Sequence, residues 1–135
     1  MKKLLEFGRK VLNSQPFSVL LGTELELFEP GKAVLTLAVR KELKQQHGFV
    51  HGGVVSYLAD NALTYAGGSV LGDSLTSEYK INYLRPAIGD KLVARASVLS
   101  AGKKQAVCQC EVWAVGDGGE RMVAVAQGTI IKVQS

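Results

Sequence analysis

The sequence lacks the motifs of most cofactor-dependent enzymes. It contains no Gly-rich phosphate loop, no dinucleotide-binding fingerprint and no serine-hydrolase elbow. Its only two cysteines are Cys108 and Cys110, and no further cysteine or histidine cluster accompanies them to complete a zinc site. We therefore expect no metal and no redox cofactor, and we interpret both cysteines as small core residues in a reducing compartment.

A strong excess of one charge is also missing. The chain has 16 Lys and Arg residues against 12 Asp and Glu residues, which gives a net charge of +4. No basic run is interleaved with aromatic residues. This weak positive charge is compatible with a small anionic ligand and predicts no nucleic-acid partner.

Segments typical of an export signal or a membrane span are absent as well. Near the N-terminus, Glu6, Arg9 and Lys10 interrupt the apolar residues, and no small-residue cleavage site follows. The low-charge segment 51–71 contains several polar residues and flanking glycines, which argue against a span. We therefore expect a cytoplasmic protein without a membrane partner.

The residues that are present predict a small α+β protein. With 135 residues, 47% of them hydrophobic and 21% charged, the chain suits one domain over residues 1–135 with a substantial core. Helical periodicity predicts a short amphipathic helix at 2–13 and a long helix at 51–68. Strands are expected at 18–28, 32–40, 75–83, 91–100, 104–115 and 121–133. Hairpins would join the last four strands into an antiparallel sheet, and the long helix would cover one face of that sheet.

The strand at 75–83 shows a period of two. Leu75, Tyr79 and Tyr83 are expected on one face of this strand, and Thr76 and Glu78 on the other.

The long helix contains a single charged residue, Asp60. Small residues surround this position on a helical wheel, namely Gly53, Ser56, Thr64 and Gly67, and they would allow another backbone to approach closely. The helix is therefore expected to be enclosed by the sheet and by a second subunit. A poorly solvated carboxylate is a better base or nucleophile, whereas the simpler alternative is an Asp that caps a loop or pairs with a surface Lys.

The segment 45–62, QQHGFVHGGVVSYLADNA, resembles the signature of the phenylacetic-acid-degradation-type hotdog thioesterases. That signature has a His-Gly-Gly motif followed by an acidic residue nine positions after the His, and His51, Gly52, Gly53 and Asp60 match it. Thr76, Tyr83 and Pro86 match a further family feature, and the resemblance covers residues 18–133. It implies a hotdog fold, in which an antiparallel sheet wraps around one long central helix.

The resemblance also implies an acyl-CoA thioesterase and a set of site residues. The amide of Gly52 would stabilise an oxyanion, while Asp60 would activate water or attack the thioester carbonyl. Thr76 would hydrogen-bond Asp60 or water, and the alternative is an ordinary strand Thr. His51 would orient the loop or contact the carbonyl, and the alternative is a His hydrogen-bonded to backbone at the start of the helix. Gln45 stands where the family usually has Asn, so Gln46 is an alternative donor. Gly53, Gln46 and Asn61 are expected beside the substrate.

The spacing of these residues bears on the assembly. Gly52 and Asp60 lie about 12 Å apart along one helix, which is too far for both to act on one carbonyl. In the family the acid of one subunit faces the glycine of another, which implies a homodimer or a dimer of dimers with sites at the interface.

Two other functions fit the same fold. One is a non-catalytic acyl-CoA-binding protein, and the other is a hydratase or dehydratase. For all three functions the acyl group is expected in a tunnel between helix and sheet, near Tyr57, Leu63, Tyr65 or Tyr83. Arg85, Arg95, Lys103 and Lys104 are candidates for the CoA phosphates, although a solvated hairpin is the usual place for such residues.

Overall fold

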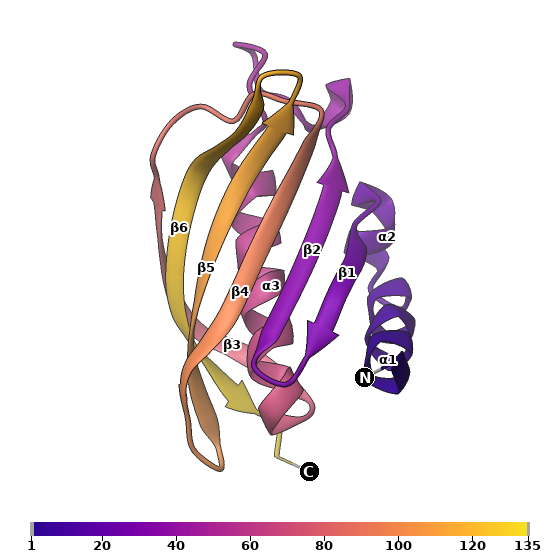
Figure 1. Cartoon of the computed structure of the whole chain (residues 1–135), viewed down its shortest axis with the longest axis vertical. Helices are drawn as coiled ribbons and strands as arrows, with labels where there is room; N and C mark the ends of the chain where they lie inside the picture. Colours follow the sequence, from indigo (N-terminus) through magenta and orange to yellow (C-terminus); the bar gives the residue numbers. More distant parts are fainter. Residues whose placement is uncertain (1, 135) are drawn as a thin grey trace.

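One long helix lies against a six-stranded sheet in the computed structural model, which describes residues 2–134 (Figure 1). The helices are α1 (Lys2–Asn13), α2 (Pro16–Leu21) and α3 (Gly52–Leu71), with a short 3-10 turn at Lys41–Leu43. The strands are β1 (Glu24–Glu29), β2 (Lys32–Ala38), β3 (Ser74–Tyr83), β4 (Lys91–Ala101), β5 (Gln105–Gly116) and β6 (Gly119–Lys132). All neighbouring strands are antiparallel, so the predicted hotdog fold is confirmed.

The order of the strands corrects one prediction. The sheet runs β1-β2-β4-β5-β6-β3, so β3 pairs with β6 at the edge instead of forming a hairpin with β4. The connection 84–90 carries Pro86 and crosses the ends of β6 and β5, where Leu84 N donates to Val123 O and Asp90 N to Val115 O. Gly89 is needed in this crossing, because a Cβ there would lie 2.6 Å from Val115 O.

The strand expected at 18–28 begins only at Glu24. Residues 16–21 form the helix α2 instead, with Pro16 in its first turn. Gly22 closes this helix with φ of 82°, and its N–H donates to Ser18 O and Val19 O. Pro16 and Gly22 thus define a helix too short to show a clear period in the sequence.

The core lies between α3 and the inner face of the sheet. Leu58, Ala62 and Leu63 of α3 are fully buried, as are Leu35 and Leu92 of the strands. The helix approaches β6 closely at Gly67, where an added Cβ would lie 2.7 to 2.9 Å from Ile130 side-chain atoms.

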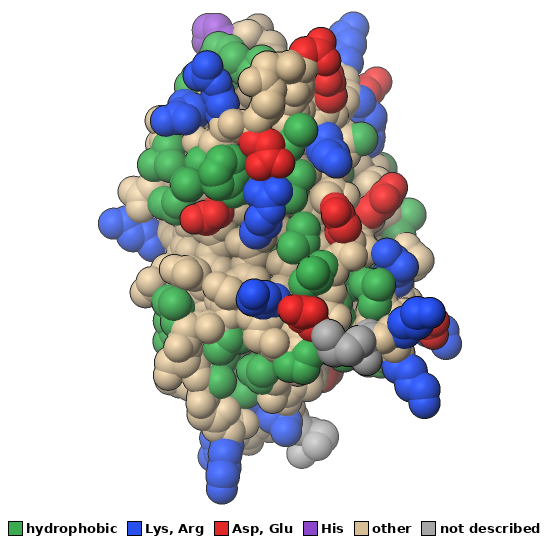
Figure 2. Space-filling view, viewed as in Figure 1, with side chains coloured by type: hydrophobic (Ala, Val, Ile, Leu, Met, Phe, Trp, Pro, Cys, Tyr) green, Lys and Arg blue, Asp and Glu red, His purple; other side chains and the backbone are tan. Residues whose placement is uncertain are grey.

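The outer face of the sheet carries charges of both signs with hydrophobic side chains among them (Figure 2). On this face Arg95 pairs with Glu120 at 3.2 Å and lies over the Trp113 ring, so it is engaged within the chain. Lys103 and Lys104 are exposed beside the hairpin between β4 and β5. Within residues 2–134, no helix is long and apolar enough to cross a membrane.

Candidate active site

The first turn of α3 presents one amide that has no partner. His51 is the N-cap residue, and its Nδ1 accepts a hydrogen bond from Gly53 N at 2.8 Å. This cap requires a glycine, because a Cβ at Gly53 would lie 2.9 Å from Nδ1. Among residues 2–134 the Gly52 N–H finds no acceptor. It points out of the positive end of a 20-residue helix, where an oxyanion is stabilised.

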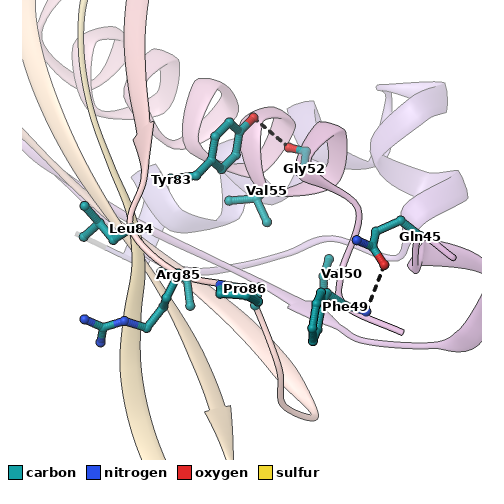
Figure 3. A pocket seen from close by; sticks show the side chains of 11 residues that line it. Gln45, Phe49, Val50, Gly52, Val55, Tyr83, Leu84, Arg85 and Pro86 are labelled. Carbon is teal, nitrogen blue, oxygen red and sulfur yellow. Dashed lines mark hydrogen bonds between the residues drawn. The ribbon is translucent and has the colours of Figure 1, made fainter. Parts of the chain in front are cut away.

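Gln45 shapes the loop that leads to this helix. Its Oε1 accepts from His47 N at 2.6 Å and from Phe49 N at 3.2 Å. Its Nε2 makes no hydrogen bond with the described residues, so a donor stays available beside the cavity that Gln45 and Gly52 both line (Figure 3). Gln46 is exposed, and its side chain makes no hydrogen bond with any of residues 2–134.

Asp60 is half-buried and is held by two threonines. Thr76 Oγ1 donates to Asp60 Oδ1 at 2.6 Å, which confirms the expected contact. Thr64 Oγ1 donates to Asp60 O at 2.9 Å and lies 2.7 Å from Thr76 Oγ1. The second carboxylate oxygen has no hydrogen bond within residues 2–134 and is available to a water molecule. The sequence interpretation missed the role of Thr64, although its position four residues after Asp60 places it on the same helix face.

The expected alternation of β3 is wrong at Thr76. Thr76 pairs with Ile130 and Glu78 with Thr129, so Ser77 is an extra residue in a β-bulge. The bulge turns Thr76 to the inner face, which it shares with Tyr79 and Tyr83. A strict period of two places it on the outer face, away from Asp60.

Asn61 lies on the other flank of α3. Its Nδ2 approaches Gln15 Oε1, Ser18 Oγ and Tyr57 Oη at 3.2 to 3.3 Å. The amide therefore ties α3 to α2 and is not brought together with Asp60. Its expected place beside the substrate stays a prediction.

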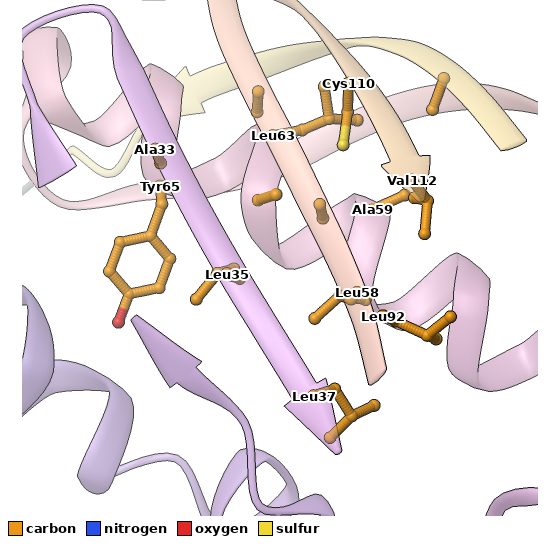
Figure 4. Close-up of a cluster of buried hydrophobic side chains, with 14 of the residues drawn as sticks. Ala33, Leu35, Leu37, Leu58, Ala59, Leu63, Tyr65, Leu92, Cys110 and Val112 are labelled. Carbon is orange, nitrogen blue, oxygen red and sulfur yellow. The ribbon is translucent and has the colours of Figure 1, made fainter. Parts of the chain in front are cut away.

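The expected acyl tunnel also differs from the structure. Leu63 is fully buried, and Tyr65 packs on Phe28 and donates to Gly8 O at 2.8 Å, so both belong to the core (Figure 4). Burial raises the pKa of the Tyr65 hydroxyl well above its ordinary range. The Tyr57 hydroxyl is hydrogen-bonded to Ser18 and Thr23 on the α2 side. Of the four expected residues only Tyr83 lines a cavity at the candidate site.

Gly52 and Asp60 of one chain do not share a cavity. Tyr83 Oη donates to Gly52 O at 3.0 Å, so the end of β3 is fastened to the start of α3. Thr76 fastens the beginning of the same strand to Asp60. The free amide and the carboxylate thus lie at two separate points along the edge strand of one chain.

Comparison with known proteins agrees with this fold and residue pattern. Residues 47–120 match the thioesterase superfamily. An Archaeoglobus fulgidus protein named "Putative esterase" is 34% identical over 122 residues, covering 90% of this chain and 77% of the relative. The Escherichia coli protein named acyl-coenzyme A thioesterase PaaI is 36% identical over 93 residues, covering 68% and 66%. A solved thioesterase family protein from Silicibacter pomeroyi has a TM-score of 0.88 at 35% identity, covering 91% of this chain and 93% of that one.

The chain belongs to the thioesterase superfamily. It is a thioester hydrolase with the hotdog fold, and its resemblance to the phenylacetic-acid-degradation-type enzymes is confirmed.

Proposed function

We propose that the chain hydrolyses acyl-CoA thioesters in sites that two copies of the chain share. One observation carries this proposal: the same helix holds an unpartnered Gly52 N–H and an Asp60 that is fixed by Thr76. The two groups lie about 12 Å apart by helical rise. A second copy that runs antiparallel to the first would bring the Asp60 of one chain to the Gly52 of the other.

The β3 edge suits such a pairing. Thr76 and Tyr83 pair with Ile130 and Ala124, which are six residues apart on β6, so six ladder steps separate them. The midpoint of this span is Lys80, which pairs with Gln127. On α3 the midpoint between residues 52 and 60 is Ser56, and Ser56 hydrogen-bonds Tyr79, the neighbour of Lys80. A two-fold axis near Lys80 would therefore exchange the two halves of the site on both elements at once.

In this arrangement the Gly52 N–H and the Gln45 amide would bind the thioester oxygen. Asp60 of the other copy would take a proton from water while the water oxygen bonds to the carbonyl carbon. Collapse of the oxyanion would break the C–S bond, and the CoA thiolate would leave and take up the proton. Alternatively, Asp60 would attack the carbonyl and expel the CoA thiolate as the C–S bond breaks, and water would hydrolyse the resulting anhydride to the free acid and the Asp60 carboxylate. Neither route needs a metal or a redox cofactor, and we propose a cytoplasmic location for the reaction.

The first experiment measures thiol release from acetyl-, hexanoyl-, palmitoyl-, benzoyl- and phenylacetyl-CoA with the wild type and Asp60→Asn. We expect turnover of at least one substrate and a loss of at least a hundredfold in the variant. Wild-type activity in Asp60→Asn would refute the role of the carboxylate. Tight binding without thiol release would favour an acyl-CoA-binding protein, and an enoyl product would favour a hydratase.

A complementation experiment tests the shared site. Gly52→Pro replaces the amide hydrogen with a ring carbon, and the helix accepts it, because proline is tolerated in the first turn, His51 already has φ of −57° and ψ of 134°, and an added Cβ would meet Tyr83 only at 3.6 Å. Asp60→Asn and Gly52→Pro chains are each expected to be inactive. Mixed dimers would contain one intact site, and random mixing would restore about a quarter of the wild-type rate. Absence of recovery in confirmed mixed dimers would refute the shared site.

Cysteine cross-linking tests the position of the axis. Lys80→Cys is expected to form a disulfide between two copies, because residues on the axis face each other at about 5 Å. Glu78→Cys is the matched control on the same face. Residue 78 of one chain and residue 78 of the other would be four ladder steps apart, about 13 Å, which is too far for a disulfide. A cross-link at residue 78 and none at residue 80 would refute this register.

A further inference from the structure

A cavity of about 350 Å³ lies directly beside the Gly52 amide (Figure 3). The start of α3, the loop 45–50 and the connection 84–87 form its walls. Its floor is apolar and consists of four residues that are at most 6% exposed, namely Val50, Val55, Ala87 and Val123.

Backbone hydrogen bonds hold these walls together. Val50 N donates to Ala87 O at 3.0 Å, and Leu84 N donates to Val123 O at 2.8 Å. Tyr83 adds a third tie through its bond to Gly52 O. The cavity is therefore formed before a ligand arrives, which lowers the entropy cost of binding.

The unpartnered donors of the cavity are those of Gly52 and Gln45 described above. Arg85 is the single charged residue of the lining; it is exposed, and in Figure 3 its side chain extends away from Gly52. The floor therefore offers no partner to a charged or amide-containing group, which would lose its hydration there.

We propose that this cavity receives the acyl group of the substrate and selects uncharged, apolar acyl groups. This inference rests on the proposed function. A thioester carbonyl at Gly52 has the acyl group on one side and the pantetheine arm on the other. The arm carries two amides that need hydrogen-bonding partners, whereas an alkyl or aryl group gains free energy on an apolar floor.

The first test compares hexanoyl-CoA with adipoyl-CoA, which has the same chain length and a terminal carboxylate. We expect kcat/KM for hexanoyl-CoA to be more than tenfold higher, because the carboxylate would be desolvated without a partner. A ratio of tenfold or less would overturn the proposed selectivity.

The second test changes the cavity in opposite directions. Ala87→Val fills the floor and is expected to lower kcat/KM for decanoyl-CoA at least tenfold, while the value for acetyl-CoA changes less than threefold. Phe49→Ala removes a half-buried ring from the wall and so enlarges the cavity. It is expected to raise the ratio of kcat/KM for decanoyl-CoA to kcat/KM for acetyl-CoA. Val34→Ala, on the outer face of the sheet, is the control and should leave this ratio unchanged.

Opposite shifts in the two variants cannot arise from a general loss of stability. Equal changes for decanoyl- and acetyl-CoA, or no change in either variant, would overturn the inference. In that event, dependence of the wild-type rate on Asp60 would still support the proposed function. If no acyl-CoA is hydrolysed, the proposed function fails as well.

Discussion

Thr76 donates its hydroxyl hydrogen to Asp60 Oδ1 across 2.6 Å, so an edge strand fixes the rotamer of the single acidic residue of α3. Hydrogen bonds to charged groups contribute about 1.5–3 kcal/mol. We expect Thr76→Val to lower kcat about tenfold to a hundredfold with less than a threefold change in KM, measured by thiol release. Thr76→Ser should retain most of the rate, and an unchanged kcat in Thr76→Val would contradict this role.

Thr64 is expected to act through the same contact. The two threonine hydroxyls carry two hydrogens for three short contacts, so the hydrogen bonds of Thr64 and Thr76 depend on each other. We expect Thr64→Val to lower kcat less than Thr76→Val does, and to add little to the loss when both are combined. A double-mutant cycle on kcat measures this coupling, and strictly additive losses would show that the two residues are independent.

The glycine pair Gly67-Gly68 provides a stability test with a built-in control. Gly→Ala within a helix ordinarily gains about 1 kcal/mol. At Gly68 the added methyl group would meet only Ser74 Oγ at 3.9 Å, so Gly68→Ala should raise the free energy of unfolding. At Gly67 it would overlap Ile130 in the core, so Gly67→Ala should lower that free energy by about 1–3 kcal/mol. Urea unfolding of the two variants measures the difference, and equal stabilities would contradict the close packing of α3 on β6.

The two buried thiols make the stability depend on alkaline pH. Burial raises the pKa of Cys108 from 9.0 to about 11, and burial together with the charge of Glu111 raises that of Cys110 to about 12. At pH values between the pKa of these thiols in the unfolded chain and the raised values in the folded protein, the folded protein keeps thiol protons that the unfolded chain releases. The stabilising contribution is therefore complete below about pH 9 and is lost as the pH rises towards 11 to 12.

This loss is measurable by urea unfolding at pH 8, 9.5 and 10.5. The free energy of unfolding should fall with pH in the wild type, and more steeply than in a Cys108→Ala/Cys110→Ala variant, in which only other groups titrate. Identical pH dependence of the two proteins would contradict the effect of the thiols.

The sequence predicted the parts of the fold that long periodic segments encode. The helix expected at 51–68 is present as Gly52–Leu71, and the helix at 2–13 is present as Lys2–Asn13. A helix of six residues is too short to show a period, so α2 was missed. The position of β3 depends on contacts between distant strands, and a hairpin with β4 could not be distinguished from pairing with β6 by local residues alone.

The candidate site was predicted unevenly for similar reasons. The His-Gly-Gly motif located the amide, and the low charge of α3 singled out Asp60. The direction of the Asn61 amide depends on α2, which had not been recognised. The structure adds the reason why the Gly52 N–H is free: His51 Nδ1 accepts from the next amide, that of Gly53, and a sequence does not show which amide a cap will occupy.

The bulge at Ser77 has a consequence for how this enzyme can change. Ser77 has no partner on β6, so deleting it would leave Thr76 opposite Ile130 and facing Asp60 in a regular strand. If the bulge closed with Ser77 still present, Ser77 would move opposite Ile130 and Thr76 would turn to the outer face. The support of Asp60 therefore tolerates a strand that is one residue shorter at this point.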